Sequence, residues 1–334
     1  MKYLKELENC ELCEWRCKVN RLSGERGICR VGLPEVAYSD LAPTLGSYSV
    51  TMLGCCFRCL YCNAYRLSQY PDAGWFYRGY VPPKELAKET MDKLESTIGK
   101  SLGANKISFT GGEPTIHLPF IEEVVKEVKK FVKNLGVGIA TNGFCTQNTL
   151  KRIIKIATSI SFEIKAYDEE VNRVLTGAPS EPILRNAEIL IKNYKEKIRV
   201  FRSVVIPGIT DTQIPKIAEF IANLDPAIPY RLIGFRPNFI LYYHPGPSEK
   251  NMEKLTSICR KLGLQDVSWS GYYPIEPKKH DLIKKADQYY STPEGRLAAL
   301  YLLSAGCPTH PRSCGTCFIR DKCPACLMEP WNLR

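Results

Sequence analysis

The sequence predicts an α/β protein with a parallel sheet, because short apolar runs alternate with amphipathic segments through its middle. The runs are rich in β-branched and aromatic residues and are bounded by Gly, Pro or Asn, as strands are. We expect strands at 48–53, 106–110, 137–141, 160–165, 200–206 and 230–235. We expect helices at 84–96, 119–132, 149–157, 182–194, 214–224 and 249–262. Such strand–helix repeats form either an open doubly wound sheet or a partial barrel.

Length and charge set the class of protein. The chain has 334 residues, enough to bury a large core, and a formal net charge of +11. The basic residues are scattered over the expected helix faces, which favours a solvated surface over a nucleic-acid site. The first 14 residues are charged throughout, and the uncharged stretch 297–311 is too short to cross a bilayer. We therefore expect a cytoplasmic protein without a membrane partner.

Fifteen cysteines need an explanation in a cytoplasmic chain, where reducing conditions disfavour disulfides. Most of them lie in three clusters with C-x2-C spacing, which is typical of metal sites. Disulfides of the kind that hyperthermophiles use are a minor alternative. The clusters are Cys10, Cys13, Cys17 and Cys29; Cys55, Cys59 and Cys62; and Cys307, Cys314, Cys317, Cys323 and Cys326. Cys56, Cys145 and Cys259 fall outside this pattern.

The middle cluster lies in the stretch GCCFRCLYCN, directly after the first expected strand. A parallel α/β architecture places its reactive loops at such strand ends. Four-iron clusters normally take four thiolates, so the three of Cys55, Cys59 and Cys62 would leave one iron open to a ligand. Zinc is the alternative. Cys56 does not fit the spacing, and we interpret it as a packed thiol beside the ligands.

This loop resembles the signature of the radical S-adenosylmethionine family, C-x3-C-x2-C with an aromatic residue, here Tyr61, before the last cysteine. The resemblance implies a 4Fe-4S cluster whose open iron chelates the amino and carboxylate groups of S-adenosylmethionine. One electron, from a donor such as ferredoxin or flavodoxin, then cleaves the sulfonium to a 5′-deoxyadenosyl radical. That radical abstracts hydrogen from the substrate, while the protein orients the cofactor.

A second motif, FTGGEPT at 109–115, follows the second expected strand. Its glycines let the backbone approach a ligand closely. In the family this turn hydrogen-bonds the methionine ammonium group. The resemblance therefore implies cosubstrate contacts from Gly111, Gly112, Glu113, Pro114 and Thr115.

Further motifs resemble the activating enzymes of glycyl-radical enzymes such as pyruvate formate-lyase. They are ATNGF at 140–144, FEIKAYDEEVNRVLTG at 162–177 and VVIPGITD at 204–211. The resemblance implies cosubstrate contacts from Thr141, Glu163 and Lys165, although Ala140 stands where the subgroup often has aspartate. His244 is similar to a late histidine near the adenosine, or is a surface histidine. Over residues 47–246 the resemblance implies a partial (βα)6 barrel.

We divide the chain into an N-terminal cysteine-rich module with its linker (1–46), a radical barrel (47–272) and a C-terminal extension (273–334). The N-terminal cysteines hold a cluster or zinc, or are a structural staple. The C-terminal motif is similar to the auxiliary-cluster domains of peptide-modifying radical enzymes, with a final gap one residue shorter. We expect an auxiliary four-iron cluster there, with Cys307 as the spare cysteine and zinc as the alternative.

Three hypotheses about function follow from these motifs. The first is a radical enzyme that acts on a protein or peptide, either as an activase or by modifying a side chain. The second is a radical enzyme that modifies RNA, which the positive charge permits. The third is a binding protein stabilised by zinc or a cluster, without turnover.

Overall fold

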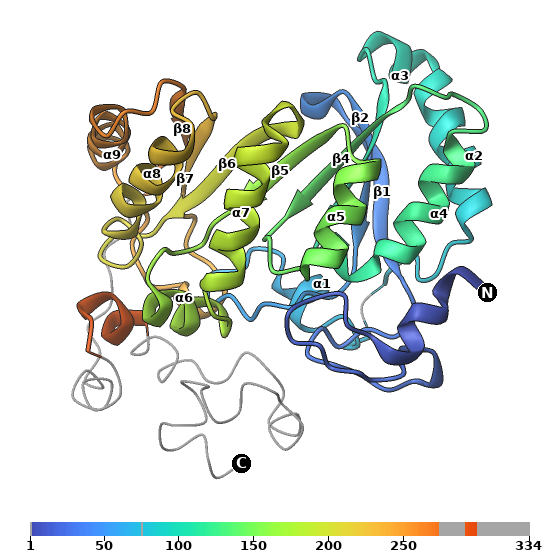
Figure 1. Cartoon of the computed structure of the whole chain (residues 1–334), viewed down its shortest axis with the longest axis horizontal. Helices are drawn as coiled ribbons and strands as arrows, with labels where there is room; N and C mark the ends of the chain where they lie inside the picture. The colour runs from blue at the N-terminus through green and yellow to red at the C-terminus, as the bar shows by residue number, and fades with distance from the viewer. Residues whose placement is uncertain (1, 75, 274–290, 299–334) are drawn as a thin grey trace. The chain divides into compact units, whose positions relative to one another are not determined.

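The structure is a computed structural model, and it describes residues 2–74, 76–273 and 291–298. The chain divides into two compact units. Figure 1 labels helices and strands of the chain in order. Unit 1 comprises residues 1–56 and 64–161, and unit 2 comprises residues 57–63 and 162–334. The cysteine loop therefore begins in unit 1 and continues in unit 2.

Unit 1 is built on four strands that are neighbours in chain order. These are β1 (Val36–Ala42), β2 (Ser47–Met52), β3 (Lys106–Gly111) and β4 (Gly136–Thr141). β1 runs antiparallel to β2, whereas β2, β3 and β4 are parallel. Met52 pairs with Gly111 in this register, so the loops that follow β2 and β3 leave the sheet at the same edge.

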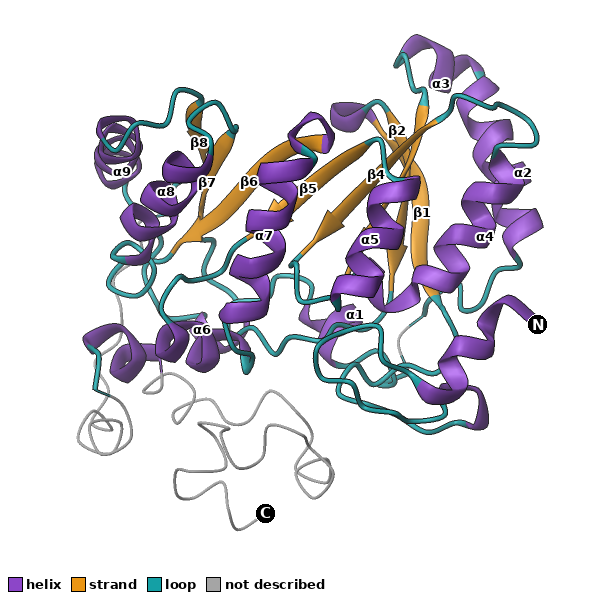
Figure 2. Cartoon of the chain, viewed as in Figure 1, coloured by secondary structure: helices purple, strands orange, loops and turns teal. Residues whose placement is uncertain are grey.

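Helices cover the strands of unit 1, with α4 and α5 on the face turned to the viewer in Figure 2. In α5, Leu150, Ile153 and Ile154 are buried while Lys151 and Lys155 are exposed, as an amphipathic helix requires. The helices are α1 (Tyr65–Gln69), α2 (Pro83–Glu95), α3 (Thr97–Ser101), α4 (Leu118–Val128) and α5 (Gln147–Ile156). The 3-10 helices are η1 (Lys2–Asn9), η2 (Arg21–Ser23), η3 (Pro43–Leu45) and η4 (Pro114–His117).

Unit 2 also consists of parallel strands and helices. Its parallel strands are β6 (Ile198–Val205), β7 (Tyr230–Gly234) and β8 (Val267–Ser270), while β5 (Ser159–Glu163) spans the boundary between the units. Phe162 and Phe201 pack in its core with ring centroids 5.1 Å apart. Its helices are α6 (Glu169–Thr176), α7 (Glu181–Asn193), α8 (Gln213–Leu224) and α9 (Glu249–Lys261), with η5 (Lys195–Lys197) and η6 (Phe239–Leu241).

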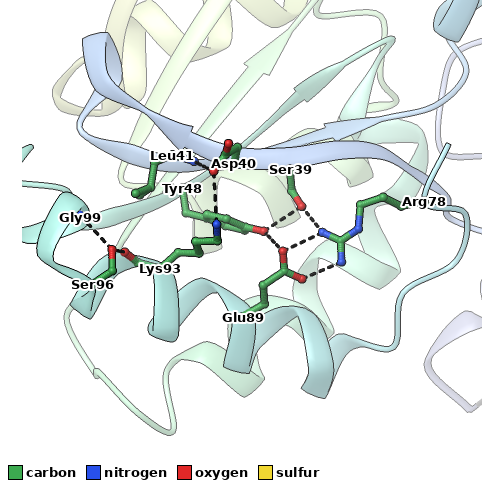
Figure 3. A network of polar contacts seen from close by, with 9 residues as sticks. All are labelled: Ser39, Asp40, Leu41, Tyr48, Arg78, Glu89, Lys93, Ser96 and Gly99. Atoms are coloured by element: carbon green, nitrogen blue, oxygen red, sulfur yellow. Dashed lines mark hydrogen bonds and ion pairs between the residues drawn. The ribbon is translucent and has the colours of Figure 1, made fainter. Parts of the chain in front are cut away.

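Each expected strand and each expected helix is present, but the expected linker is wrong. Part of it forms β1, which extends the sheet as an antiparallel strand. A polar network fixes β1 and β2 to α2 (Figure 3): Arg78 forms a bidentate ion pair with Glu89 at 2.8 and 2.6 Å, and Tyr48 donates to Ser39 at 2.8 Å. Residues 36–42 are therefore part of the sheet rather than a connection between modules.

Among the described residues, no helix combines the length and the apolar character that a membrane span requires.

Candidate functional site

In unit 1, the GGEP turn packs backbone to backbone against the start of the cysteine loop. The Gly112 amide donates to the Met52 carbonyl at 3.0 Å, and the Glu113 amide donates to the Gly54 carbonyl at 2.9 Å. A Cβ atom on Gly112 would lie 1.8 Å from the Gly54 oxygen, so only glycine allows this approach. The double glycine thus fixes the turn directly beside Cys55.

The Glu113 side chain is buried and joins the end of β3 to the end of β4. Its carboxylate accepts hydrogen bonds from the Thr115 amide at 3.1 Å, the Thr141 hydroxyl at 2.8 Å and the Asn142 amide at 2.7 Å. Burial raises the pKa of Glu113, against the lowering effect of these donors. These three donors take up most of the acceptor capacity of the carboxylate, so the side chain holds the ends of β3 and β4 together. Its expected contact with the cosubstrate stays a prediction.

Asn142 connects Glu113 to the cysteine loop, because its backbone contacts Glu113 and its side chain contacts two cysteines. Its side-chain amide donates to the sulfur atoms of Cys55 at 3.7 Å and Cys56 at 3.5 Å. Its carbonyl oxygen accepts from the Phe144 amide at 3.0 Å, which holds the side chain in this rotamer. The sequence motif contained Asn142, but its spacing gave no sign of this contact.

Cys56 is the point where the N-terminal module meets the loop. The Trp15 indole donates to the Cys56 carbonyl at 2.8 Å, and Cys13 forms a β-bridge with Cys145. Burial, followed by the Cys13 and Cys55 thiols, raises the pKa of Cys56 well above its usual value. Cys56 is therefore a neutral, buried thiol, as its position outside the ligand spacing predicted.

Unit 2 presents a charged cluster beside Tyr61. Lys165 forms an ion pair with Glu163 at 2.5 Å and lies 5.7 Å from the centre of the Tyr61 ring, while Arg202 approaches Glu163 at 3.9 Å. Burial opposes both charges. Lys165 and Arg202 nevertheless lower the pKa of Glu163, and Glu163 raises that of Lys165. Both residues therefore remain ionised.

His244 is buried rather than on the surface. One ring nitrogen hydrogen-bonds the Pro207 carbonyl at 2.8 Å, and the ring lies 6.1 Å from Phe235, which in turn contacts Tyr61 at 6.4 Å. Burial lowers the pKa of His244 to about 4, so the imidazole is neutral near pH 7. His244 and Tyr61 thus belong to one aromatic row in unit 2.

Comparison with known proteins identifies the family. The model described as Radical SAM superfamily matches residues 49–221, just over half of the chain. The chain belongs to the radical SAM superfamily. It is therefore an enzyme, and the superfamily implies a 4Fe-4S cluster and S-adenosylmethionine as cofactors.

Two curated relatives and one solved structure illustrate the likeness. An uncharacterized protein of Methanocaldococcus jannaschii is 28% identical over 275 residues, which cover 77% of this chain and 76% of the relative. A pyruvate formate-lyase-activating enzyme of Staphylococcus epidermidis is 28% identical over 248 residues, with coverage of 68% and 91%. A domain of a pyruvate formate-lyase-activating enzyme from Bacteroides vulgatus has a TM-score of 0.43 at 22% identity, and covers 50% of this chain and 99% of that domain.

The residues of each unit fit the radical SAM cofactors in kind. Among the described residues, four buried hydroxyls have no hydrogen-bond partner, and two of them lie in the motifs: Thr115 in the GGEP turn and Tyr61 in the cysteine loop. The other two are those of Ser47 and Tyr230. Unpartnered buried polar atoms are costly, and a polar ligand would satisfy them. S-adenosylmethionine carries ammonium, carboxylate and hydroxyl groups, which are polar groups of the kind that each of these hydroxyls lacks as a partner.

The metal ligands themselves stay a prediction from the radical SAM motif. Cys55 and Cys59 are buried and Cys62 is partly exposed. Within the described ranges, no three Cys, His, Asp or Glu side chains are gathered closely enough to hold a single ion. Cys307, Cys314, Cys317, Cys323 and Cys326 lie outside the described residues.

Proposed function

We propose that this chain holds a 4Fe-4S cluster through Cys55, Cys59 and Cys62 and uses it to act on a protein or peptide substrate. The cluster and S-adenosylmethionine, when bound, supply one-electron cleavage of the sulfonium to a carbon radical that abstracts hydrogen. The observation that carries the proposal is the packing of the GGEP turn onto Gly54, the residue before Cys55. This packing joins the cysteine loop and the GGEP turn, the two motifs of the superfamily, through backbone hydrogen bonds.

The residues of the chain have distinct tasks in this proposal. The backbone of Gly111–Gly112 offers polar groups to the methionine ammonium group, with Pro114 fixing the start of η4 beside it. Glu113 and Thr141 hold the ends of β3 and β4 together, since the Thr141 hydroxyl donates a hydrogen bond to the Glu113 carboxylate. Asn142 orients Cys55 through its amide.

In unit 2, Lys165 is a cation suited to the cosubstrate carboxylate, and Glu163 is an anion suited to its ammonium or ribose hydroxyl groups. The buried Tyr61 hydroxyl donates to the same ligand. His244, being neutral, can accept or donate a hydrogen bond toward the adenosine without adding charge.

The substrate class rests on the named relatives. An enzyme that activates pyruvate formate-lyase acts on a protein, and such an enzyme is 28% identical over 68% of this chain. RNA is the second candidate because the chain carries a net charge of +11. A binding protein without turnover no longer fits, because the chain is a radical SAM enzyme.

Cleavage of S-adenosylmethionine tests the chemistry. Reconstituted protein with reductant should form 5′-deoxyadenosine and methionine, measured by mass spectrometry. Cys55→Ala, Cys59→Ala and Cys62→Ala should each abolish both products. Cys259→Ala, a buried thiol of α9, is the matched control and should retain them. Full cleavage in any of the three loop variants contradicts the ligand set, and loss of the cluster in Cys56→Ala would mean that the register is wrong.

A second experiment separates the substrate classes. The reconstituted protein is incubated with reductant, S-adenosylmethionine and a glycyl-radical enzyme encoded near its gene. If that enzyme is the substrate, the yield of 5′-deoxyadenosine should rise and electron paramagnetic resonance should show a glycyl radical. Binding of RNA that falls steeply with salt, with hydrogen abstraction from that RNA, would favour the second class. We also propose that the C-terminal cysteines hold an auxiliary cluster, so that Cys314→Ala should lose about four irons while cleavage survives.

A further inference from the structure

Backbone hydrogen bonds and a close glycine contact hold the N-terminal module together around Cys10 and Cys17. The Cys10 amide donates to the Val19 carbonyl at 3.1 Å, and the Lys18 amide donates back to the Cys10 carbonyl at 3.0 Å. A Cβ atom on Gly27 would lie 2.9 Å from the Cys17 sulfur, so the turn that leads to Cys29 packs directly on Cys17. Three of the four thiols are buried.

The backbone beside these cysteines is strained. Four non-glycine residues of the described chain have positive φ, and three of them are in this module: Arg16 at 43°, Lys18 at 58° and Arg30 at 61°. They flank Cys17 on both sides and follow Cys29. Strain of this kind clusters at functional sites, where the surrounding structure holds it in place.

Arg21 is a buried cation inside the same module, with a side chain only 1% exposed. It donates to the carbonyls of Gly32 at 2.9 Å and Ile116 at 2.6 Å, and to the Cys10 sulfur at 3.7 Å. Among the described residues, no carboxylate forms an ion pair with Arg21. Carbonyl oxygens satisfy its hydrogen bonds but do not balance its charge, and buried charges are normally paired.

The cysteines can supply the missing anion, but only as thiolates. Metal binding removes the thiol protons, and four thiolates around a divalent ion or a four-iron cluster leave a net negative charge. Neutral thiols would leave Arg21 unbalanced. The contact between Arg21 and Cys10 is therefore placed where a thiolate-bound centre would need a cation.

We propose that Cys10, Cys13, Cys17 and Cys29 bind an iron–sulfur cluster, in which each thiolate binds its own iron and the four need not surround a single ion, with Arg21 as its buried counter-cation. This inference goes beyond the proposed function, since it would hold whatever the radical chemistry acts on. Arg21 also ties the centre to unit 1, because its guanidinium contacts the His117 ring at 3.4 Å and His117 hydrogen-bonds the Leu53 carbonyl at 2.7 Å. The same arginine thus links the module to the residue before Gly54.

Metal retention in full-length variants tests the proposal. Iron, zinc and acid-labile sulfide are counted per chain before and after a chelator challenge, in wild type, Arg21→Gln, Arg21→Lys and Arg26→Gln. Arg26 is the matched control, because it belongs to the same module but is exposed. Arg21→Gln should weaken metal retention roughly 10- to 100-fold, as loss of an outer partner of a metal site does. Arg21→Lys should fall between wild type and Arg21→Gln, and Arg26→Gln should match wild type.

Several outcomes decide against the proposal. Wild-type retention in Arg21→Gln would show that Arg21 only clamps carbonyls, and equal loss in Arg21→Lys and Arg21→Gln would show that its charge is not what matters. If Arg21→Gln does not fold by circular dichroism, Cys29→Ser replaces it, and an unchanged metal count there overturns the centre. Iron with sulfide supports the cluster, whereas zinc without sulfide contradicts it, because no three described Cys, His, Asp or Glu side chains are gathered closely enough to hold a single ion. Formation of 5′-deoxyadenosine, measured in parallel, reports separately on the radical site.

Discussion

Glu113 in unit 1 lies just after β3, and Glu163 in unit 2 is the last residue of β5. Their carboxylates are nevertheless held in opposite ways. Glu113 accepts three hydrogen bonds from neutral groups, and burial raises its pKa. Glu163 lies between two cations, which lower its pKa in spite of burial. The first is a scaffold group that already accepts three protein donors, and the second is a group held by opposite charges, with acceptor capacity left for a ligand. A motif residue can therefore serve the family's chemistry by holding the fold rather than by touching the cosubstrate.

The largest effect is expected from Gly112→Ala, which would test whether unit 1 is the scaffold. The added methyl group would collide with the Gly54 carbonyl, so the turn or the cysteine loop must move. We expect a loss of about 4 kcal/mol or more in the free energy of unfolding, measured by anaerobic urea titration. Gly103→Ala is the control for backbone strain alone, because Gly103 has a positive φ, which Gly112 does not, and open space around it, and it should cost only about 1–2 kcal/mol. Equal costs would show that the close packing is not what requires glycine.

Lys165→Met tests whether the Glu163–Lys165 ion pair of unit 2 binds the cosubstrate. It leaves Glu163 with only the longer contact to Arg202. We expect destabilisation of about 2 kcal/mol, less than for a fully buried pair because both side chains keep some exposure, and a loss of cosubstrate binding. Calorimetry with S-adenosylmethionine measures the binding. Unchanged affinity would remove Lys165 from the site.

Glu113→Gln sharpens the comparison through pH. We expect it to cost about 1–3 kcal/mol, because an amide offers one acceptor oxygen where the carboxylate offers two. The raised folded pKa means that the contribution of Glu113 is complete below its ordinary value of about 4.3 and is lost as pH rises through the folded pKa. Glu163 has the opposite sign: its contribution is complete above about 4.3 and is lost as pH falls through its lowered folded pKa.

Unfolding titrations of wild type, Glu113→Gln and Glu163→Gln between about pH 4 and pH 7 check these signs. The gap between wild type and Glu113→Gln should narrow as pH rises, and the gap to Glu163→Gln should widen. Two gaps that change in the same direction would break the distinction between the two glutamates.

Glu89→Gln should have the smallest effect and calibrates an ion pair away from the site. Burial raises the pKa of Glu89, but hydrogen bonds from Arg78 and Tyr48 outweigh it and lower the pKa overall. The pair is partly exposed, so we expect a cost of about 1 kcal/mol in a thermal unfolding experiment. Cleavage of S-adenosylmethionine should not change, and a large fall in cleavage would mean that the β1–α2 network supports the site.

Much of the fold could be predicted because its strands and helices carry strong periodic patterns, and the expected boundaries lie close to those observed. β1 was missed because an edge strand with only two fully buried residues gives a weak alternation. The site motifs predicted which residues matter, but a motif does not specify partners. The cosubstrate contact expected of Glu113 stays a prediction, whereas its protein donors Thr115, Thr141 and Asn142 appear only in the structure. Arg21 gave no sequence signal, since only its burial beside Cys10 makes it unusual.

The division between a scaffold glutamate and a ligand glutamate is tested most directly by the dissociation constant of S-adenosylmethionine in reconstituted wild type, Glu113→Gln and Glu163→Gln, measured by anaerobic equilibrium dialysis. We predict that Glu163→Gln weakens binding about tenfold or more, a change of about 1.4 kcal/mol, while Glu113→Gln stays close to wild type in the folded fraction. A tenfold loss in Glu113→Gln together with wild-type affinity in Glu163→Gln would contradict it.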